Sequence, residues 1–262
     1  MHLLRIAIKG PLFFLIVIAF FIVSFIADIL VQDRKKKLIT FSHIASFSAK
    51  LALILLGVKV NLRNMERYMS ADQNYMIVSN HLSYVDIFVI YTAIPSVFIA
   101  NSELEEEFPL GAITRYAGGI FVERRNRSRL LEDMNNISDV LELGLNTVLF
   151  PEATTSNGES VLPFKAPFLK SAINTNTDVL TLCINYKTVN GIPINKENRD
   201  FIFYYGEIAF YDHFFRLMTV SNIEVDLEAI EEIKVKPDMT RKELSQIAYE
   251  RISNSYKGMS DI

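Results

Sequence analysis

The stretch Tyr75-Met-Ile-Val-Ser-Asn-His-Leu-Ser-Tyr-Val-Asp86 contains the change of pattern that decides the fold of this chain. Its first five residues are mostly aromatic, apolar or β-branched, which predicts a short strand. From residue 84 to residue 93, apolar side chains recur at helical spacing, which predicts a helix. The chain therefore passes directly from a strand into a helix, with polar residues in the turn between them.

The same alternation of short β-rich runs and helical patterns continues beyond Gly57. We predict strands over residues 58–62, 75–79, 97–100, 120–123, 147–150, 179–186, 201–205 and 223–227. We predict helices over residues 84–93, 110–116, 128–143, 166–174, 211–218 and 240–256. The last helix opens with Thr240-Arg-Lys-Glu243, a capping-box pattern. Strands that alternate with helices predict one α/β domain with a mainly parallel sheet over residues 58–262.

Composition and charge exclude several classes of protein. Half of the 262 residues are apolar and 22% are charged, which excludes wholesale disorder. The single cysteine excludes a disulfide framework and cannot by itself build a thiolate metal site. The net charge of −3 combines +4 over residues 1–37 with −7 over the remaining 225 residues. Because nucleic-acid binding needs clustered basic charge, we expect no nucleic-acid partner.

The first forty residues predict a membrane anchor. Residues 11–27 carry no charge, and as a helix they would be about 25 Å long, slightly short of a bilayer core of about 30 Å. Extension to Val31 gives a full span. The run is too long for the apolar region of a cleaved signal peptide, and no small-x-small cleavage site follows it. Because residues 34–37 are all basic and outnumber Arg5 and Lys9, we expect the domain on the cytoplasmic side, at the inner membrane if the protein is bacterial.

A second apolar segment covers residues 38–56, with Ser, His and Lys residues between the apolar ones. Its spacing predicts a helix. Two arrangements remain open: a helix at the membrane, either in the interface or returning beside the first, and a buried helix of the domain. We expect residues 1–57 to form two membrane-associated helices. A transporter is excluded, because nothing after residue 57 has the apolar length of a membrane span.

His81 and Asp86 are the candidate catalytic pair. Residues five apart do not share a face of a continuous helix, but they can meet across a strand-to-helix turn. Asp86 would then accept a hydrogen bond from one imidazole nitrogen and leave the other nitrogen as a base. No nucleophilic serine accompanies the pair, which suits direct attack by a hydroxyl of the substrate. The alternative is that Ser83 and Asp86 form a capping pair and His81 is only a loop residue.

Two further stretches carry candidate binding residues. Gly118-Gly-Ile-Phe-Val-Glu-Arg124 is a glycine turn followed by a strand, and it leads into an arginine cluster that comprises Arg124, Arg125 and Arg127. Guanidinium groups bind phosphate oxygens well, so the cluster is a candidate anion site, unless it is only a solvated charged face. Val148-Leu-Phe-Pro-Glu-Ala-Thr-Thr-Ser156 places Glu152 where an apolar strand ends, which is where ligand sites gather in α/β sheets. The alternative for Glu152 is a helix-capping or surface acid.

In this order and spacing, the three stretches resemble the glycerolipid acyltransferase family, especially its bacterial 1-acylglycerol-3-phosphate acyltransferases. The family pattern is N-H-x4-D, then G-x-x-F-hydrophobic-x-R, then F-P-E-G-T-R-S. It is matched here by Asn80-His81 to Asp86, by Gly118 to Arg124 and by Phe150-Pro-Glu-Ala-Thr-Thr-Ser156. The resemblance covers about residues 50–256. It implies a glycerol-3-phosphate acyltransferase-like fold, in which helices flank a mostly parallel mixed sheet.

The resemblance also implies a reaction. A fatty acyl group would pass from a thioester, acyl-coenzyme A or acyl carrier protein, to the free hydroxyl of a lysolipid, most directly 1-acylglycerol-3-phosphate to give phosphatidic acid. His81 would be the general base and Asp86 would orient it. No metal or redox cofactor is implied, and the partners are membrane lipids and the acyl donor. Backbone amides of the His81 turn or the Glu152 turn would hold the oxyanion. The implied substrate-binding residues are Gly118, Phe121, Arg124, Pro151, Glu152 and Thr154.

Three departures from the family pattern concern the acceptor. Thr155 and Asn101 stand where family members carry an arginine and often a lysine, two charges that are associated with the acceptor phosphate. Ala153 replaces a glycine, and we expect its methyl group to bar a positive backbone φ. The segment that ends at Gly158 is more similar to a bacterial branch that includes lyso-ornithine lipid acyltransferases. A lyso-ornithine lipid or another lysophospholipid is therefore an alternative acceptor, and a non-catalytic lipid-binding homologue is a second alternative.

Overall fold

The computed structural model describes residues 2–123, 128–165 and 167–259. Within these residues, eight strands form one sheet in the order β1-β8-β6-β2-β5-β3-β4, with β7 paired to β6. The strands are β1 (Val58–Arg63), β2 (Met76–Ser79), β3 (Val97–Asn101), β4 (Ile120–Val122), β5 (Thr147–Leu149), β6 (Val179–Val189), β7 (Ile192–Pro193) and β8 (Ile223–Ile233). Pairing is parallel along β6-β2-β5-β3-β4 and between β1 and β8, whereas β6 pairs antiparallel with β8 and β7. The predicted mostly parallel mixed sheet is confirmed.

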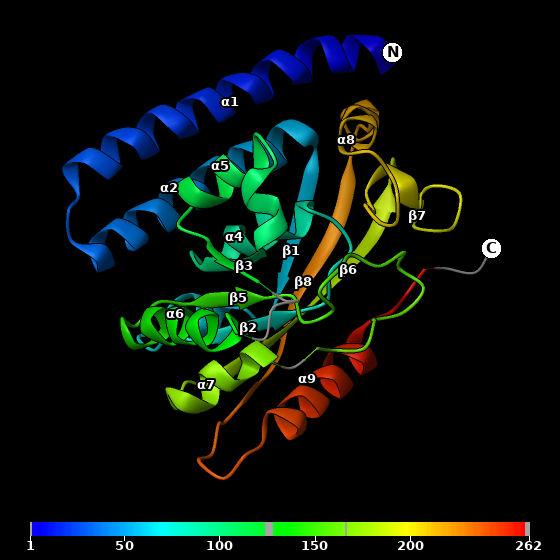
Figure 1. Cartoon of the computed structure of the whole chain (residues 1–262). Coiled ribbons are helices and arrows are strands. Elements are labelled where there is room, and N and C mark those ends of the chain that lie inside the picture. Colours follow the sequence, from blue (N-terminus) through cyan, green and yellow to red (C-terminus); the bar gives the residue numbers. More distant parts are fainter. Residues whose placement is uncertain (1, 124–127, 166, 260–262) are drawn as a thin grey trace.

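Helices cover both faces of the sheet (Figure 1). They are α1 (His2–Leu30), α2 (Arg34–Leu56), α3 (Glu66–Met69), α4 (Val85–Ala93), α5 (Leu110–Tyr116), α6 (Leu130–Glu142), α7 (Lys170–Asn174), α8 (Phe210–Thr219) and α9 (Arg241–Ser255). Three short 3₁₀ turns join them: η1 (Ser102–Glu106), η2 (Pro167–Leu169) and η3 (Arg199–Phe201). The capping box predicted for the last helix is confirmed, because Thr240 and Glu243 each receive the backbone N–H of the other.

Two apolar cores lie on opposite faces of the sheet, because successive strand residues point to opposite sides. In β2, Ile77 belongs to the core under α2, α4 and α8, whereas Met76 and Val78 belong to the core under α6, α7 and α9. All three residues are fully buried. Burial on both faces explains why β2 is read as a continuous apolar run and not as an alternating one.

The strand predicted over residues 201–205 is wrong. The chain there forms the end of η3 and an irregular segment. Its aromatic side chains suggested a strand, but they pack around the turn that follows β2 instead. The backbone N–H of Tyr204 donates to the carbonyl of Leu82 at 2.9 Å, and the ring of Phe203 makes an edge contact with Tyr186 at 5.6 Å. Strands β6 and β8, in contrast, continue beyond the predicted residues, to Val189 and Ile233.

The helix α2 packs against the domain and also lies beside α1. One face is buried against the domain, where the Ser46 hydroxyl donates to the backbone carbonyl of Tyr91 in α4 at 2.6 Å. Another face lies beside α1 (Figure 1), whereas Phe47 and Ile54 are exposed. Residues 34–56 are therefore packed as part of the domain and still present an apolar stripe outward.

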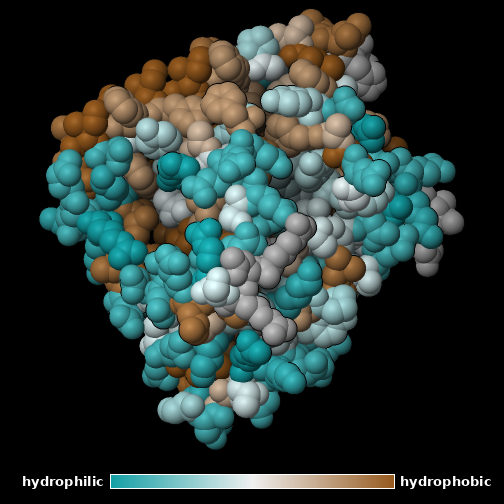
Figure 2. Space-filling view, in the orientation of Figure 1, coloured by the Kyte–Doolittle hydropathy of each residue, from teal (hydrophilic) through white to brown (hydrophobic). Residues whose placement is uncertain are grey.

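The helix α1 lies along the domain and is held at both ends. Near its start, the Lys9 ammonium donates to the carbonyls of Leu56 and Val220 at 2.8 and 2.7 Å, where α2 and α8 end. Near its other end, Asp28 pairs with Lys37 at 2.7 Å. Both α1 and α2 are long and apolar enough to cross a membrane by length and composition, and most of α1 is exposed. In Figure 2 the apolar side chains gather along the edge that α1 forms.

Candidate active site

The turns after β2 and β5 meet at one edge of the sheet. These strands are parallel neighbours, so their carboxyl ends lie side by side. Asn80 and His81 follow the first strand, and Phe150, Pro151 and Glu152 follow the second. Ligand sites of α/β sheets form at this edge. The His81 and Glu152 motifs, 71 residues apart in sequence, therefore belong to one site.

The side chains of His81 and Asp86 meet across the strand-to-helix turn. The imidazole Nδ1 lies 2.9 Å from Oδ2 of Asp86. The same oxygen accepts the backbone N–H groups of Leu82 and Ser83, at 2.6 and 2.9 Å. Asp86 thus closes the start of α4, as the capping alternative requires, and orients the histidine as well. Because the carboxylate accepts from Nδ1–H, the tautomer with an unprotonated Nε2 is favoured.

The Asp86 carboxylate is completely buried, and its second oxygen is also engaged. The phenol of Tyr186, from the neighbouring strand β6, donates to Oδ1 at 2.8 Å. Burial, together with the nearby Asp86 charge, raises the pKa of Tyr186 well above its usual value, so it stays a donor. A buried carboxylate with four donors is held in one orientation and is compensated for the loss of water.

The imidazole of His81 is positioned for proton transfer. Its ring stacks on Phe150 with the centroids 3.9 Å apart and an angle of 11° between the planes. The side chain is 18% exposed, and Nε2 has no hydrogen-bond partner among the described residues. An imidazole fixed at Nδ1 and open at Nε2 has the geometry of a general base.

Asn80 holds the turn to the sheet. Its side-chain amide donates to the carbonyl of Ile184 at 3.0 Å, and its side-chain oxygen accepts the N–H of the same residue at 2.8 Å. Asn80 therefore continues the pairing of β2 with β6 beyond the last strand residue. This paired contact fixes the backbone that carries His81.

Glu152 is neither a helix cap nor a surface acid. Its side chain is 2% exposed, and its two oxygens accept backbone N–H groups from His81 at 2.7 Å and Leu162 at 2.8 Å. Burial raises the pKa of Glu152 to about 7, against the effect of these two hydrogen bonds, and the nearby Asp86 charge adds to the rise. The carboxyl group thus binds groups inside the protein, and its hydrogen bonds join the His81 turn to the segment after Gly158.

Ala153 adopts the backbone conformation that its methyl group was expected to prevent. Its φ is 63°, in the left-handed region, so this expectation is wrong. The sharp turn after β5 requires the conformation, because the N–H of Ala153 donates back to the carbonyl of Phe150 at 3.1 Å. A non-glycine residue there costs about 1 kcal/mol. The loop then returns to the other turn, where the N–H of Ser156 donates to the carbonyl of His81 at 2.9 Å.

The other expected binding residues are dispersed. Pro151 is buried in the turn beside Glu152, and Thr154 is exposed in the same loop. Phe121 is half-buried in β4, opposite Ala100 of β3. Gly118 lies at the amino end of β4, away from the His81 edge, and has φ of 79°. A Cβ atom there would lie 3.2 Å from Leu38 of α2, so glycine is explained by close packing and turn geometry.

The arginine cluster lies outside the described residues, which end at Glu123 and resume at Ser128. The anion site expected at Arg124, Arg125 and Arg127 therefore stays a prediction. Strand β4 runs parallel to β3, so the chain enters this segment from the same edge of the sheet as His81. Elsewhere in the described ranges, no three His, Cys, Asp or Glu side chains gather as ligands for a metal ion.

Three amides of the His81 turn already have acceptors. His81 N–H donates to Glu152, and the N–H groups of Leu82 and Ser83 donate to Asp86. These groups cannot also point at an oxyanion. The turn after β5 is therefore the better candidate for binding the oxyanion through its backbone amides. Within that turn, Thr154 is exposed.

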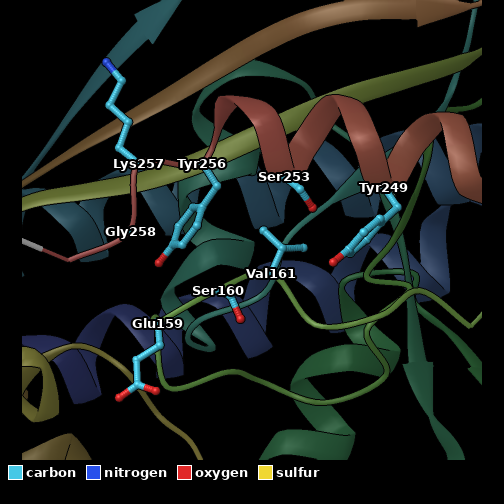
Figure 3. Close-up of a pocket in the computed structure, with 8 residues that line it drawn as sticks. All are labelled: Glu159, Ser160, Val161, Tyr249, Ser253, Tyr256, Lys257 and Gly258. Atoms are coloured by element: carbon cyan, nitrogen blue, oxygen red, sulfur yellow. The ribbon is translucent and has the colours of Figure 1, made fainter.

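A cavity of about 240 Å³ lies behind the loop that Glu152 braces. In Figure 3, Tyr249, Ser253 and Tyr256 of the C-terminal segment face residues 159–161. The phenol of Tyr256 donates to the carbonyl of Gly158 at 2.8 Å. The C-terminal segment thus supports the loop that follows Glu152.

The sequence alone does not predict four of these contacts. The partners Tyr186, Leu162 and Ile184 reach the site from far along the chain, and no spacing rule relates them to His81. Phe150 belongs to the third motif, but the motif does not indicate that its ring stacks on the imidazole. The available signal was only that Phe150 directly follows an apolar strand.

Comparisons with known proteins show that the chain is similar to acyltransferases. A family model described as "Acyltransferase" matches residues 59–185. The chain is 27% identical over 210 residues to a lyso-ornithine lipid O-acyltransferase of Rhizobium meliloti, covering 78% of this chain and 71% of that one. It is 38% identical over 117 residues to a 1-acyl-sn-glycerol-3-phosphate acyltransferase of Neisseria gonorrhoeae, covering 44% of this chain and less than half (46%) of that one.

A solved structure resembles the chain over almost its whole length. The crystal structure of the 1-acyl-sn-glycerophosphate acyltransferase PlsC from Thermotoga maritima matches with a TM-score of 0.70, covering 98% of this chain and 97% of that one. At 24% sequence identity, this match establishes the fold, including the two long N-terminal helices. The expected fold class is therefore confirmed.

Proposed function

Because this chain belongs to the acyltransferase family, we propose that it transfers a fatty acyl group from a thioester to the free hydroxyl of a lysolipid. The observation that carries the proposal is the His81–Asp86 pair, with Nδ1 bound at 2.9 Å and Nε2 open. The donor would be acyl-coenzyme A or acyl carrier protein. The leading acceptor is 1-acylglycerol-3-phosphate, and the product would be phosphatidic acid.

The proposed mechanism begins at the His81–Asp86 pair. Nε2 of His81 takes the proton of the acceptor hydroxyl as the oxygen attacks the thioester carbonyl carbon. The imidazolium that forms is stabilised by the buried Asp86 carboxylate. When the tetrahedral intermediate collapses, the C–S bond breaks, and the thiolate leaves with the proton from Nε2. Amides of the loop at Thr154 are proposed to stabilise the oxyanion, and Arg124 to bind the acceptor phosphate.

A second acceptor, a lyso-ornithine lipid, is favoured by a separate observation. The alignment to the lyso-ornithine lipid enzyme covers 78% of this chain, whereas the alignment to the Neisseria enzyme covers 44%. Thr155 and Asn101 replace the two basic residues that the resemblance associates with an acceptor phosphate. Asn101 instead donates to Glu103 at 2.9 Å.

Membrane association is proposed on the basis of exposed apolar surface. Leu15, Ile22 and Phe25 of α1 are about half exposed or more, as are Phe47 of α2 and Phe215 of α8. The helix α1 contacts both α2 and α8 in the fold (Figure 1), and apolar side chains gather along the edge that α1 forms (Figure 2). The proposed lysolipid acceptor and its product reside in a bilayer. We propose that residues 1–57 attach the domain to the membrane, with the domain on the cytoplasmic side.

The test is acyl transfer by the purified full-length protein in detergent. Thiol release is measured with each acyl donor and with a panel that includes 1-acylglycerol-3-phosphate, lyso-ornithine lipid and other lysophospholipids. Turnover with one acceptor, and a fall of about a thousandfold in His81→Ala with its folding retained, would support the proposal. If no acceptor is acylated, the chain is a non-catalytic lipid-binding member. If lyso-ornithine lipid alone is acylated, the leading acceptor is wrong.

A further inference from the structure

Tyr186 contacts the catalytic pair from a different part of the fold. It lies in β6, 100 residues after Asp86, with its side chain almost fully buried. Its phenol donates to Oδ1 of Asp86 at 2.8 Å. Its ring is braced by an edge contact with Phe203 at 5.6 Å. No motif in the sequence includes it.

The four donors to Asp86 are not equivalent. His81, Leu82 and Ser83 donate to Oδ2 and belong to the turn that Asp86 itself closes, so they would move together with it. Tyr186 is the donor that comes from the sheet, and it alone among the described residues occupies Oδ1. Its hydrogen bond therefore determines how the carboxylate is rotated relative to the sheet.

We propose that Tyr186 is a positioning residue of the acyl-transfer reaction, acting on His81 through Asp86. By holding Oδ1, it keeps Oδ2 directed at Nδ1 of the imidazole. By donating a hydrogen bond, it also withdraws negative charge from the carboxylate. This weakens the electrostatic attraction between the carboxylate and an imidazolium. The proposal rests on the proposed function of His81 as the base.

Other ionisable groups face the pair and must be held constant in any test. Glu152 faces it from the turn after β5, and Tyr256 faces it from the end of α9. On the side of α4, Tyr84 interacts electrostatically with Tyr186, and the Tyr84 phenol lies 3.0 Å from Nδ1 of His213 in α8. Burial lowers the pKa of His213 to about 4, and that of Glu152 is about 7. Glu152 is therefore the group whose titration overlaps the working range.

The experiment compares Tyr186→Phe with the wild-type protein and with Tyr91→Phe. Tyr91 is also buried, lies in α4, and its hydroxyl has no partner within the described part of the chain. We expect Tyr186→Phe to lower kcat about three- to tenfold with little change in KM, because one hydrogen bond to a charged group is lost. We also expect the acid limb of the kcat profile to move to higher pH. Tyr91→Phe should change neither.

A second variant and a second readout keep the proposal testable if the phenylalanine variant folds poorly. Replacement of Tyr186 by 3-fluorotyrosine keeps the ring and makes the phenol a stronger donor, so the acid limb should move to lower pH. The profiles are repeated in a Glu152→Gln background, which removes the overlapping titration. In addition, the proton NMR signal of the His81 Nδ1–H should shift between the variants.

Unchanged kcat, pH profile and Nδ1–H signal in both Tyr186 variants would overturn the proposal. A fall in activity that follows a fall in thermal stability, with the pH profile unmoved, would also overturn it, because Tyr186 would then be only a packing residue. Failure of the proposed function is distinguishable. In that case the wild-type protein acylates no lysolipid, while the Nδ1–H signal still reports whether Tyr186 acts on the pair.

Discussion

Oε1 of Glu152 accepts the backbone N–H of His81 at 2.7 Å. Glu152, in the turn after β5, therefore holds the turn after the neighbouring strand β2. The other carboxyl oxygen holds Leu162 at 2.8 Å. One buried side chain therefore joins three backbone segments around the candidate base. The resemblance implied that Glu152 positions the acceptor, and its hydrogen bonds indicate that any such effect acts through the loops it holds.

The first prediction concerns the pH dependence of stability. Burial raises the pKa of Glu152 from 4.5 to about 7 in the folded protein, so the folded state keeps a proton that the unfolded state loses above about pH 5. The stabilisation is fully present below the unfolded pKa and is lost as the pH rises towards 7. We expect this group to lower the free energy of unfolding by at most about 3 kcal/mol over that window.

Glu152→Gln isolates the effect, because glutamine does not titrate. Denaturant unfolding in detergent is measured at several pH values between 5 and 8. The stability difference between wild type and variant should shrink as the pH rises. Glu142→Gln, at an exposed position of α6, is the matched control and should leave the slope unchanged. Parallel curves for wild type and Glu152→Gln would contradict the prediction.

The second prediction concerns the strained turn after β5. Ala153 has a φ of 63°, so Ala153→Gly should raise the free energy of unfolding by up to about 1 kcal/mol, because glycine adopts this conformation without steric cost. Ala112→Gly in the helix α5 is the control and should lower it by about 1 kcal/mol. Urea denaturation measures both. Equal destabilisation by the two substitutions would show that Ala153 is not strained.

Much of the fold follows from local pattern. The strand before the His81 turn and the helix after it were predictable because short β-rich runs alternate with helical patterns. The prediction failed over residues 201–205, where aromatic side chains serve the packing of a loop and not a strand. Strands β6 and β8 are each eleven residues long and extend further than expected, because they pair antiparallel with each other. This pairing keeps polar residues in strand conformation, although the apolar pattern of the sequence did not predict a strand there.

The candidate site was predictable only in part. Motif order indicated His81, Asp86 and Glu152, and parallel neighbouring strands bring all three to one edge. The hydrogen-bond partners were not predictable, because Tyr186 and Leu162 reach the site through tertiary packing. Ala153 shows a further limit of prediction from sequence. The preference of alanine against a positive φ is about 1 kcal/mol, and the contacts that hold the turn after β5 override it.

The third prediction concerns acceptor choice. Thr155 is half-buried in the loop after β5, where the resemblance places an arginine. Thr155→Arg should raise kcat/KM for 1-acylglycerol-3-phosphate about tenfold relative to lyso-ornithine lipid, because a guanidinium binds a phosphate with charge-assisted hydrogen bonds. The ratio of the two rates under competition is the measurement. Ser160→Arg adds the same charge at an exposed position of the loop, and an equal effect there would mean that the charge acts non-specifically.

The fourth prediction concerns the attachment of α1 to the domain. The Lys9 ammonium donates to the carbonyls of Leu56 and Val220, where α2 and α8 end, and such carbonyls have no partner within their own helices. Lys9→Met keeps the apolar stem and removes both hydrogen bonds. We expect faster backbone hydrogen exchange in the first half of α1 and at the end of α8, with exchange in the sheet unchanged.

Lys36→Met, at an exposed position near the start of α2, removes a charge without breaking such a contact and should leave exchange in α1 as it is in the wild type. Measured in lipid nanodiscs, the comparison also bears on how the protein sits at the membrane. A helix that crosses the bilayer on its own would be protected by lipid whether or not Lys9 is present. Equal exchange in Lys9→Met and the wild type would therefore contradict an α1 that depends on the domain for its position.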